Sequence, residues 1–261
     1  MKVVVLGGTS DIGEQLIKSF LLKNYEVFAT CRTHKDNENL AENVDWLKQD
    51  ISSTDRSSFK NWLKKIGNWD IFISCIGSQE PIGLINNVNS LEWAEGINVN
   101  STYQMTALID ALPFKAKGKD CSVIFFAGGG TNSATPHYSA QTLGKILLIK
   151  FVELIDAEIE ELKICILGPG WVKTKIHNAT LNAKKESGDN YEKTIRMLNS
   201  EKLNPISKVV EDINKLLAMP KYLISGRNFS SVYDNLSINN LERLYKKDKD
   251  FYKLRRSQNN Q

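Results

Sequence analysis

Short apolar runs rich in β-branched residues alternate along this chain with longer segments whose apolar residues recur every three or four positions. The short runs predict strands at residues 3–6, 26–31, 46–49, 71–75, 122–126, 163–167 and 222–225. The longer segments predict helices at residues 11–23, 55–65, 91–112, 136–160 and 207–218. Strands that are apolar throughout and alternate with helices are typical of a parallel sheet covered on both faces. We therefore predict an α/β fold with a doubly wound parallel sheet.

Two stretches interrupt this alternation within a single domain that spans residues 1–261. Residues 171–204 are polar and rich in helix-forming residues, so we predict a helical lid between the sixth and seventh strands. Residues 227–261 form a C-terminal extension that mixes Lys and Arg with aromatic residues. These aromatic residues include Phe229, Tyr233, Tyr245, Phe251 and Tyr252. Because burying a large aromatic ring stabilises a folded protein, we expect this extension to pack against the domain.

Composition limits the kinds of partner. The chain has 34 Lys and Arg against 30 Asp and Glu, and this net charge of +4 indicates neither a nucleic-acid site nor a membrane surface. No apolar run approaches the roughly 20 residues of a membrane span, and the first run is too short for a secretory signal. We therefore expect a cytoplasmic protein whose partner is a small molecule. The four cysteines lie far apart, without a CxxC pair or a histidine at ligand spacing, which indicates reduced thiols and no metal site.

A glycine-rich turn joins the first predicted strand directly to the first helix. Residues 6–13 read Leu-Gly-Gly-Thr-Ser-Asp-Ile-Gly. In such a turn, backbone N–H groups and the positive end of the helix dipole bind a pyrophosphate, and glycine is needed where a Cβ would block the ligand. The residues predicted to form this dinucleotide site are Gly7, Thr9, Ser10, Asp11, Ile12 and Gly13.

This turn resembles that of the short-chain dehydrogenase/reductase family, which reads TGxxxGxG. The outer glycines match, while Leu6 replaces the threonine and Asp11 replaces the middle glycine. We expect the Asp11 carboxylate to cap the helix. The resemblance extends over about residues 1–230 and implies a Rossmann-type fold of about seven strands that binds NAD or NADP.

Three later motifs carry the same resemblance. Asp50 and Ile51 are similar to the Asp-Val pair that holds the adenine ring in the family. Residues 74–77 read Ser-Cys-Ile-Gly where the family has Asn-Asn-Ala-Gly, which implies that Gly77 lies at the cofactor. The family's Pro-Gly-x-x-x-Thr turn near the nicotinamide is matched at residues 169–174, which implies cofactor contacts by Pro169, Gly170, Val172 and Thr174.

The charge at the end of the second predicted strand distinguishes NAD from NADP. NAD sites place a carboxylate there for the ribose hydroxyl, whereas the 2′-phosphate of NADP requires a cation. This segment has no acidic residue before Asp36, and Arg32 can bind a phosphate with two N–H groups. Thr30 or Thr33 can add a hydroxyl, and Lys35 adds positive charge. We therefore predict NADP as the cofactor in preference to NAD.

The catalytic residues that the resemblance implies are only partly present. The family uses an Asn on the fourth helix, a Ser after the fifth strand and a Tyr-x-x-x-Lys motif on the fifth helix. Asn98 fits the first role, and Asn100 is the less favoured register. The Ser position falls on Ala127 or Gly128, so that hydroxyl is missing.

Two registers compete for the Tyr-x-x-x-Lys motif. In one register Tyr138 is the tyrosine and Thr142 replaces the lysine; in the other Gln141 replaces the tyrosine and Lys145 is the lysine. We favour the second, because the glycines at 128–130 and the motif then follow the family's spacing without a gap. Reduction of a carbonyl needs a proton donor, and a Gln amide cannot supply a proton at neutral pH. The donor is then Tyr138, or Lys145 if burial lowers the pKa of the lysine. The resemblance also implies that Lys145 holds the nicotinamide ribose of the cofactor.

Two functions are compatible with these residues. The first is an NADP-dependent oxidoreductase acting on an alcohol or ketone. The C-terminal tail resembles that of relatives in bacterial surface-sugar pathways, which favours a sugar or nucleotide-sugar derivative as substrate. The second is an NADP-binding protein with little or no redox activity, a sensor or the partner subunit of an active relative, which the missing Ser and Tyr favour.

We also expect a homo-oligomer, either a dimer or a tetramer, because family members commonly pair their fourth and fifth helices across a two-fold axis. These helices carry more apolar residues than one face can bury on the sheet. The residues concerned are Tyr103, Leu108, Leu147, Leu148 and Phe151.

Overall fold

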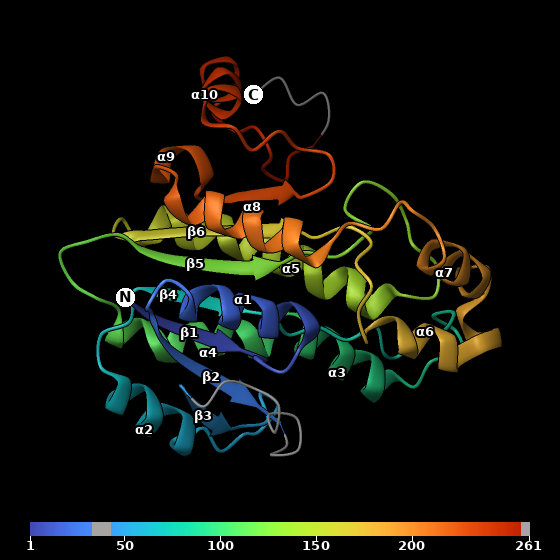
Figure 1. Cartoon of the computed structure of the whole chain (residues 1–261). Helices are drawn as coiled ribbons and strands as arrows, with labels where there is room; N and C mark the ends of the chain where they lie inside the picture. The colour runs from blue at the N-terminus through green and yellow to red at the C-terminus, as the bar shows by residue number, and fades with distance from the viewer. Residues whose placement is uncertain (33–42, 257–261) are drawn as a thin grey trace.

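A single sheet of seven parallel strands forms the centre of the computed structural model, which describes residues 1–32 and 43–256 (Figure 1). The order across the sheet is β3-β2-β1-β4-β5-β6-β7, and every neighbouring pair is parallel. The strands are β1 (Lys2–Leu6), β2 (Glu26–Cys31), β3 (Val44–Lys48), β4 (Ile71–Ser74), β5 (Cys121–Phe126), β6 (Leu162–Gly168) and β7 (Arg227–Ser230). The predicted doubly wound α/β fold is confirmed.

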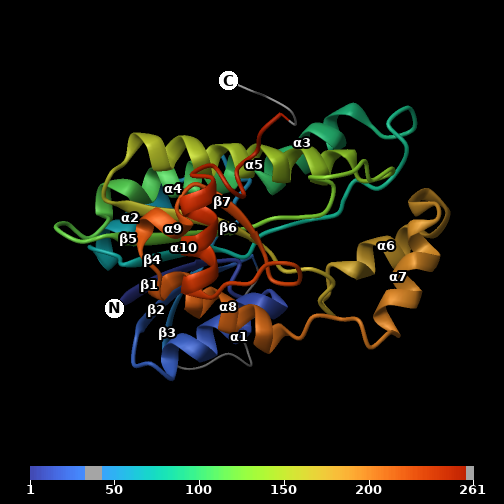
Figure 2. The same cartoon turned by 90° about the horizontal axis from the view of Figure 1, so that it is seen from above.

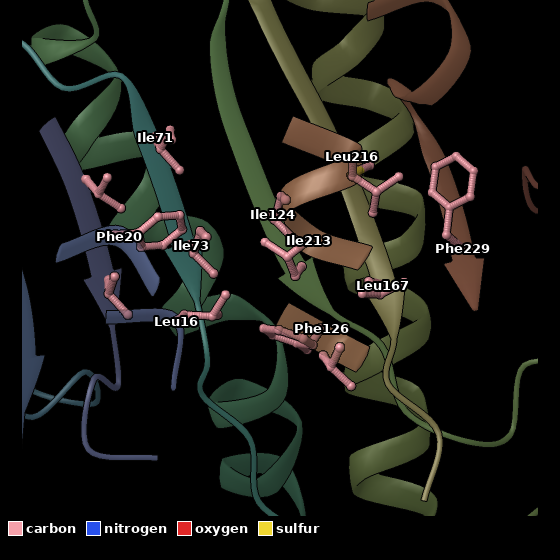
Figure 3. Close-up of a cluster of buried hydrophobic side chains, with 14 of the residues drawn as sticks. Leu16, Phe20, Ile71, Ile73, Ile124, Phe126, Leu167, Ile213, Leu216 and Phe229 are labelled. Atoms are coloured by element: carbon pink, nitrogen blue, oxygen red, sulfur yellow. The ribbon is translucent and has the colours of Figure 1, made fainter. Parts of the chain in front are cut away.

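One face of the sheet is covered by α1 (Asp11–Leu21) and α8 (Ile206–Ala218), as Figure 2 shows from above. Both helices turn a continuous apolar stripe toward the strands. In Figure 3, Leu16 and Phe20 of α1 lie beside Ile73 of β4 within this buried cluster.

The opposite face is covered by α2 (Ser57–Ile66), α4 (Thr102–Ala111) and α5 (Ser139–Glu158), while α3 (Ser90–Asn100) packs along α5. Because successive residues of a strand point to opposite faces, both sides of every central strand are buried. This explains why the strands are apolar throughout. Within the described residues, no helix is both long and apolar enough to cross a membrane.

The seventh strand differs from the prediction. Residues 222–225 belong to a short helix, α9 (Lys221–Ile224), and the strand follows it as β7. Pro220 directly precedes the helix, and a proline with φ near −60° favours the start of a helical turn. Gly226 then adopts φ of +75°, which lets the chain enter the sheet. The apolar run was therefore misread as a strand because its length fits either element.

The predicted helix at residues 91–112 is two helices. Between α3 and α4 the backbone of Ser101 leaves the helical region, with φ of −146° and ψ of −81°. The Ser101 hydroxyl donates to the Ile97 carbonyl at 2.6 Å and satisfies an acceptor at the end of α3. Periodicity does not detect such a break, because the apolar spacing continues across it.

The predicted insertion at residues 171–204 is helical. It contains α6 (His177–Ala183), the 3₁₀ helix η3 (Lys184–Ser187) and α7 (Asn190–Leu198), which project beyond the end of the sheet (Figures 1 and 2). His137 Nδ1 donates to the Glu186 carbonyl at 2.6 Å, so the insertion is fastened to the segment before α5. Its role as a lid stays a prediction.

The C-terminal extension begins inside the sheet, because its first four residues form β7. After it comes α10 (Ile238–Lys247). Phe229 and Phe251 are buried, and Tyr252 contacts both rings edge-to-face. Residues 227–256, the described part of the extension, therefore pack against the domain, with the exception of Tyr233, which is 88% exposed.

Candidate active site

The carboxyl ends of β1, β4, β5 and β6 meet at one edge of the sheet, because all strands are parallel. The loops that follow them carry the glycine turn at 7–13, then Gly77, Gly128 and the segment 169–174. The chain reverses its winding direction between β1 and β4, and doubly wound sheets bind ligands at such a point. This edge is the candidate active site.

The glycine turn is too tight for side chains at two positions. Gly7 has φ of +68°, and a Cβ there would lie 2.9 Å from Ile76 Cγ1. A Cβ on Gly13 would lie 2.7 Å from the Gly7 carbonyl oxygen. Ser10 caps α1, since its Oγ accepts the Gly13 N–H at 3.1 Å. A bare backbone that leads into a capped helix start fits the pyrophosphate of a dinucleotide.

Asp11 does not cap the helix, which corrects our expectation. Its Oδ2 accepts the backbone N–H of Lys175 at 2.7 Å, and Lys175 Nζ donates to the Thr9 carbonyl at 2.9 Å. Ser10 already provides the cap, so the Asp11 carboxylate is available to the loop after β6. This pair of bonds holds Thr174, the residue before Lys175, beside the glycine turn.

The loop at residues 169–174 is fixed from two sides. Gly170 has φ of +75°, and the Val232 side chain fills the space that a Cβ would need. Asn204 Nδ2 donates to the Pro169 carbonyl at 2.8 Å, and His177 Nε2 donates to that of Val172 at 2.9 Å. Neither Asn204 nor His177 was predicted, because no motif spacing relates either residue to this loop.

Lys145 lies in the centre of the site. Its side chain is buried, with 4% of the residue exposed, and Nζ donates to the Ile76 carbonyl at 3.2 Å. A Cβ on Gly77 would lie 3.6 Å from Lys145 Nζ, and one on Gly128 would lie 3.1 Å from Lys145 Cγ. Burial lowers the pKa of this ammonium to about 8. These contacts favour the register in which Lys145 occupies the lysine position.

Asn100, and not Asn98, reaches the site. Asn100 is fully buried; its Nδ2 donates to the carbonyls of Gly96 and Ser78, and its Oδ1 accepts the Ser78 N–H at 3.2 Å. A Cβ on Gly77 would lie 3.7 Å from this oxygen. Two helical positions correspond to a rotation of about 200°, so Asn98 points away from the residues that Asn100 contacts. The preferred register for this residue therefore needs correction to Asn100.

Tyr138 is engaged by the helical insertion. Its hydroxyl forms a 2.7 Å hydrogen bond with Thr180 Oγ1, and the Thr180 hydroxyl lies 2.7 Å from Gln79 Oε1. Burial raises the pKa of the Tyr138 phenol, which makes it a weaker acid at neutral pH. Gln141 is half-buried and lies one helical turn before Lys145, on the same face of α5.

The hydroxyl expected after the fifth strand is absent. Ala127 is buried and its N–H donates to the Leu167 carbonyl at 3.0 Å, as part of the sheet. Gly128 follows and lies against the Lys145 side chain. Neither residue offers a hydrogen-bonding side chain to a ligand.

At the other end of the site, Arg32 is exposed at the end of β2. A hydrogen bond from the Ser52 N–H is the main influence that lowers the pKa of Asp50, and the charge of Arg32 adds to it. Asp50 Oδ1 also accepts the Ser52 hydroxyl at 2.8 Å.

Thr30, one of the predicted phosphate contacts, is used within the protein. Its Oγ1 accepts the Gly7 N–H at 3.0 Å and so supports the glycine turn. The other predicted phosphate contacts, Thr33 and Lys35, lie outside the described residues.

A small recess of about 10 Å³ lies at the carboxyl ends of β1 and β2. The residues that line it are Leu6, Thr30, Gln49, Ile51, Arg56, Phe59, Ile76 and Ala107. Most of these side chains are apolar, and Ile51 is among them, as the resemblance implied for the adenine end of the cofactor. The recess, the glycine turn and Lys145 thus line one continuous edge of the sheet.

Comparison with known protein families identifies the family to which this chain belongs. The model of the short chain dehydrogenase family matches residues 1–185. The chain belongs to the short-chain dehydrogenase/reductase family. Its fold is that of the family's solved structures, and the family consists of NAD(P)-dependent oxidoreductases. A comparison with curated protein sequences found no significant match.

Three solved structures illustrate the likeness of fold. A short-chain dehydrogenase/reductase from Saccharomyces cerevisiae is 20% identical, with a TM-score of 0.79 over 90% of this chain and 98% of that one. The aldohexose dehydrogenase of Thermoplasma acidophilum is 20% identical, with a TM-score of 0.74 over 88% and 91% of the two chains. ElxO with NADP bound is 21% identical, with a TM-score of 0.71 over 88% and 96%.

Proposed function

We propose that this short-chain dehydrogenase/reductase family member is an NADP-dependent oxidoreductase that interconverts an alcohol and a ketone, with Lys145 as the proton donor. The observation that carries the proposal is the burial of Lys145 between two bare glycine backbones, Gly77 and Gly128, at the predicted nicotinamide end of the site. A pKa of about 8 makes its ammonium a competent acid near neutral pH.

The residues present fit a dinucleotide. Gly7 and Gly13 leave room for the pyrophosphate at the start of α1, and Ile51 gives the predicted adenine end of the site an apolar surface. Arg32 is available to the 2′-phosphate, which supports NADP over NAD. When bound, the nicotinamide supplies or takes up the hydride.

The chain's own residues handle the proton. Lys145 Nζ holds it against the Ile76 carbonyl and can release it to the substrate oxygen, where negative charge develops. The Gln141 amide, one turn earlier on α5, can donate a hydrogen bond to the same oxygen. Asn100 holds the loop that carries Ile76 and Ser78 through two hydrogen bonds to the Ser78 backbone. Tyr138 does not take part in this scheme, because Thr180 binds its hydroxyl.

A sugar or another polyol is the narrower proposal for the substrate. The resemblance of the C-terminal tail to surface-sugar relatives supports it, and one structural neighbour acts on aldohexoses.

A second candidate is an NADP-binding protein without redox activity. The absence of a hydroxyl at Gly128 and of a phenol at Gln141 favours it, because the two groups that bind the substrate oxygen in the family are then missing. Such a protein would retain the glycine turn and Lys145 for the cofactor alone.

The two candidates are separated by measuring NADPH binding and NADPH oxidation on one preparation. We expect fluorescence titration to show binding, and a panel of ketones and keto-sugars to be reduced. The rate should fall as pH rises through about 8, because Lys145 then loses its proton. Lys145→Met should abolish turnover, while Lys150→Met, at an exposed position of the same helix, should not. Binding without turnover of any substrate would favour the second candidate, and turnover by Lys145→Met would exclude Lys145 as the donor.

A further inference from the structure

A cleft opens to solvent beside the C-terminal extension, with a volume of about 530 Å³. Its walls come from the end of α5, from α9, from the start of β7, from α10 and from the segment after α10. The residues that line it are Asp156, Lys221, Tyr222, Ser225, Arg227, Tyr245, Lys249, Asp250 and Lys253. Several of them lie beyond residue 185, where the family match ends.

This cleft is separate from the candidate active site. Lys221 Nζ donates to the Glu160 carbonyl at 2.6 Å, just before β6 begins, and Arg227 is the first residue of β7. The cleft therefore lies at the amino ends of β6 and β7, whereas the loop at 169–174 follows the carboxyl end of β6. A strand of seven residues separates the two ends by roughly 20 Å.

Arg227 provides a fixed positive charge at the bottom of the cleft. Only 4% of the residue is exposed, and its guanidinium donates to the carbonyls of Ser225 at 2.6 Å and Lys249 at 2.7 Å. It also lies 4.4 Å from the centre of the Phe251 ring. Nε has no hydrogen-bond partner, and no ion pair among the described residues includes Arg227. Burial lowers the pKa of this group, and the charge of Asp156 acts against this shift without forming an ion pair.

The charges around the cleft do not balance. Its two carboxylates are already paired: Asp156 lies 3.7 Å from Lys221, and Asp250 lies 3.1 Å from Lys253. Arg227 and Lys249 are then left over among the lining residues, with a combined charge of two. A buried charge without a partner is costly, so an anion in this cleft would offset that cost.

An aromatic wall completes the cleft. The rings of Tyr222 and Tyr245 meet edge-to-face, with their centres 5.3 Å apart. Tyr222 is 47% exposed, so its ring is accessible to a ligand. Ring surfaces of this kind attract planar groups.

We propose that this cleft is a second ligand site, for a small phosphate ester that carries a planar ring. Its phosphate dianion faces Arg227 and Lys249, and its ring contacts Tyr222. Nothing in the proposed oxidoreductase chemistry requires this ligand, so the site is suited to regulation or to anchoring a metabolite away from the reacting centre.

Isothermal titration with two probes, inorganic phosphate and phenyl phosphate, tests the proposal on the full chain. We expect phenyl phosphate to bind about threefold or more tightly than phosphate, and Tyr222→Ala to remove that difference. Lys249→Gln should weaken both probes about tenfold, because a charge-assisted contact is lost. Lys246→Gln serves as the matched control, because Lys246 is an exposed lysine of α10 that does not line the cleft.

Repeating the titration with saturating NADPH distinguishes the cleft from the glycine turn. Binding that persists in NADPH and is weakened by Lys249→Gln supports the proposal. The proposal is overturned if neither probe binds at millimolar concentration, if NADPH displaces both probes, or if Lys249→Gln and Lys246→Gln behave alike. None of these readouts depends on turnover, so a failure of the proposed oxidoreductase function would not affect them.

Discussion

The Asp11 carboxylate accepts the backbone N–H of Lys175 at 2.7 Å, although 164 positions separate the two residues in the sequence. Lys175 Nζ returns a bond to the Thr9 carbonyl. The first turn of α1 is thereby joined to the loop after β6, and the two loops that surround the predicted cofactor position hold each other. A glycine in place of Asp11, as in most of the family, could not make this contact.

Replacing Asp11 by Ala should therefore lower the free energy of unfolding by about 1 kcal/mol, because the Lys175 N–H loses its acceptor. Urea denaturation measures this change. Glu14→Ala is the matched control, because it removes an acidic side chain from the same first turn of α1. If both variants lose the same free energy, the helix dipole and not the link to Lys175 explains the effect.

The buried Lys145 ammonium should lower the free energy of unfolding at neutral pH. Burial lowers its pKa from 10.5 to about 8, so between these values the unfolded chain binds more protons than the folded chain, and stability rises with pH. Lys145→Met should then increase the free energy of unfolding at pH 7 by on the order of 2 kcal/mol, with a smaller gain near pH 10. Lys150→Met should show no such pH dependence, since Lys150 is exposed. A less stable Lys145→Met at pH 7 would contradict the prediction.

The fold could be predicted because local pattern and global topology agree. Runs such as Val3 to Leu6 are apolar at every position, which is typical of a parallel strand that helices cover on both faces. The helices predicted between these runs repeat the α/β unit. The exception at residues 222–225 is instructive. Arg227 and Asn228 make β7 less apolar than the helix before it, so hydropathy identified the wrong segment.

The candidate active site could be predicted only in part from the sequence, because contacts between distant residues decide which side chains face the site. The glycine turn and Lys145 were found by motif spacing. Asn98 was preferred to Asn100 because residues 98–103 are similar to the family's Asn-x-x-Gly/Ser-x-Phe pattern. Such spacing does not show which of the two side chains faces the loop after β4, and the hydrogen bonds of Asn100 do. The partner of Asp11 could not be found either, because the contact depends on how the loop after β6 returns to α1.

Cofactor preference should depend on Arg32. We expect NADPH to bind more tightly than NADH, because the exposed guanidinium at the end of β2 can pair with the 2′-phosphate. Arg32→Ala should remove this preference, at a cost of about 1.5–3 kcal/mol in NADPH binding. Lys48→Ala, a change at an exposed residue at the end of the neighbouring strand β3, should leave it intact. Equal dissociation constants for both cofactors in the unmutated protein would refute the assignment.

Self-association should involve the outer face of α5. Leu143, Leu147 and Leu154 are 42%, 47% and 50% exposed on this helix, whereas Leu108 and Leu148 are buried against the sheet. Substituting Leu147→Lys together with Leu154→Lys should convert an oligomer into a monomer, as measured by light scattering at micromolar concentration. Leu22→Lys, at a residue with 86% exposure after α1, should not change the mass. A monomeric unmutated protein would exclude this interface.

The final prediction concerns the phenol that α5 lacks. Gln141 stands one turn before Lys145, so Gln141→Tyr should place a phenol beside an ammonium that lowers its pKa. We expect the reduction of small ketones to rise by about tenfold or more, because general acid catalysis typically contributes at least that much. Initial rates of NADPH oxidation measure the change.

Tyr138→Phe is the counterpart of Gln141→Tyr, because the other register makes Tyr138 the acid. The bond between its hydroxyl and Thr180 predicts that this change affects the attachment of the insertion and leaves the proton transfer intact. The pH profile of Tyr138→Phe should therefore keep the decline near pH 8 that Lys145 imposes, even if the rate is somewhat lower. NADPH affinity must be unchanged in both variants, since a larger side chain at position 141 could overpack the site. Loss of all turnover in Tyr138→Phe, with no gain in Gln141→Tyr, would reverse the assignment and make Tyr138 the proton donor.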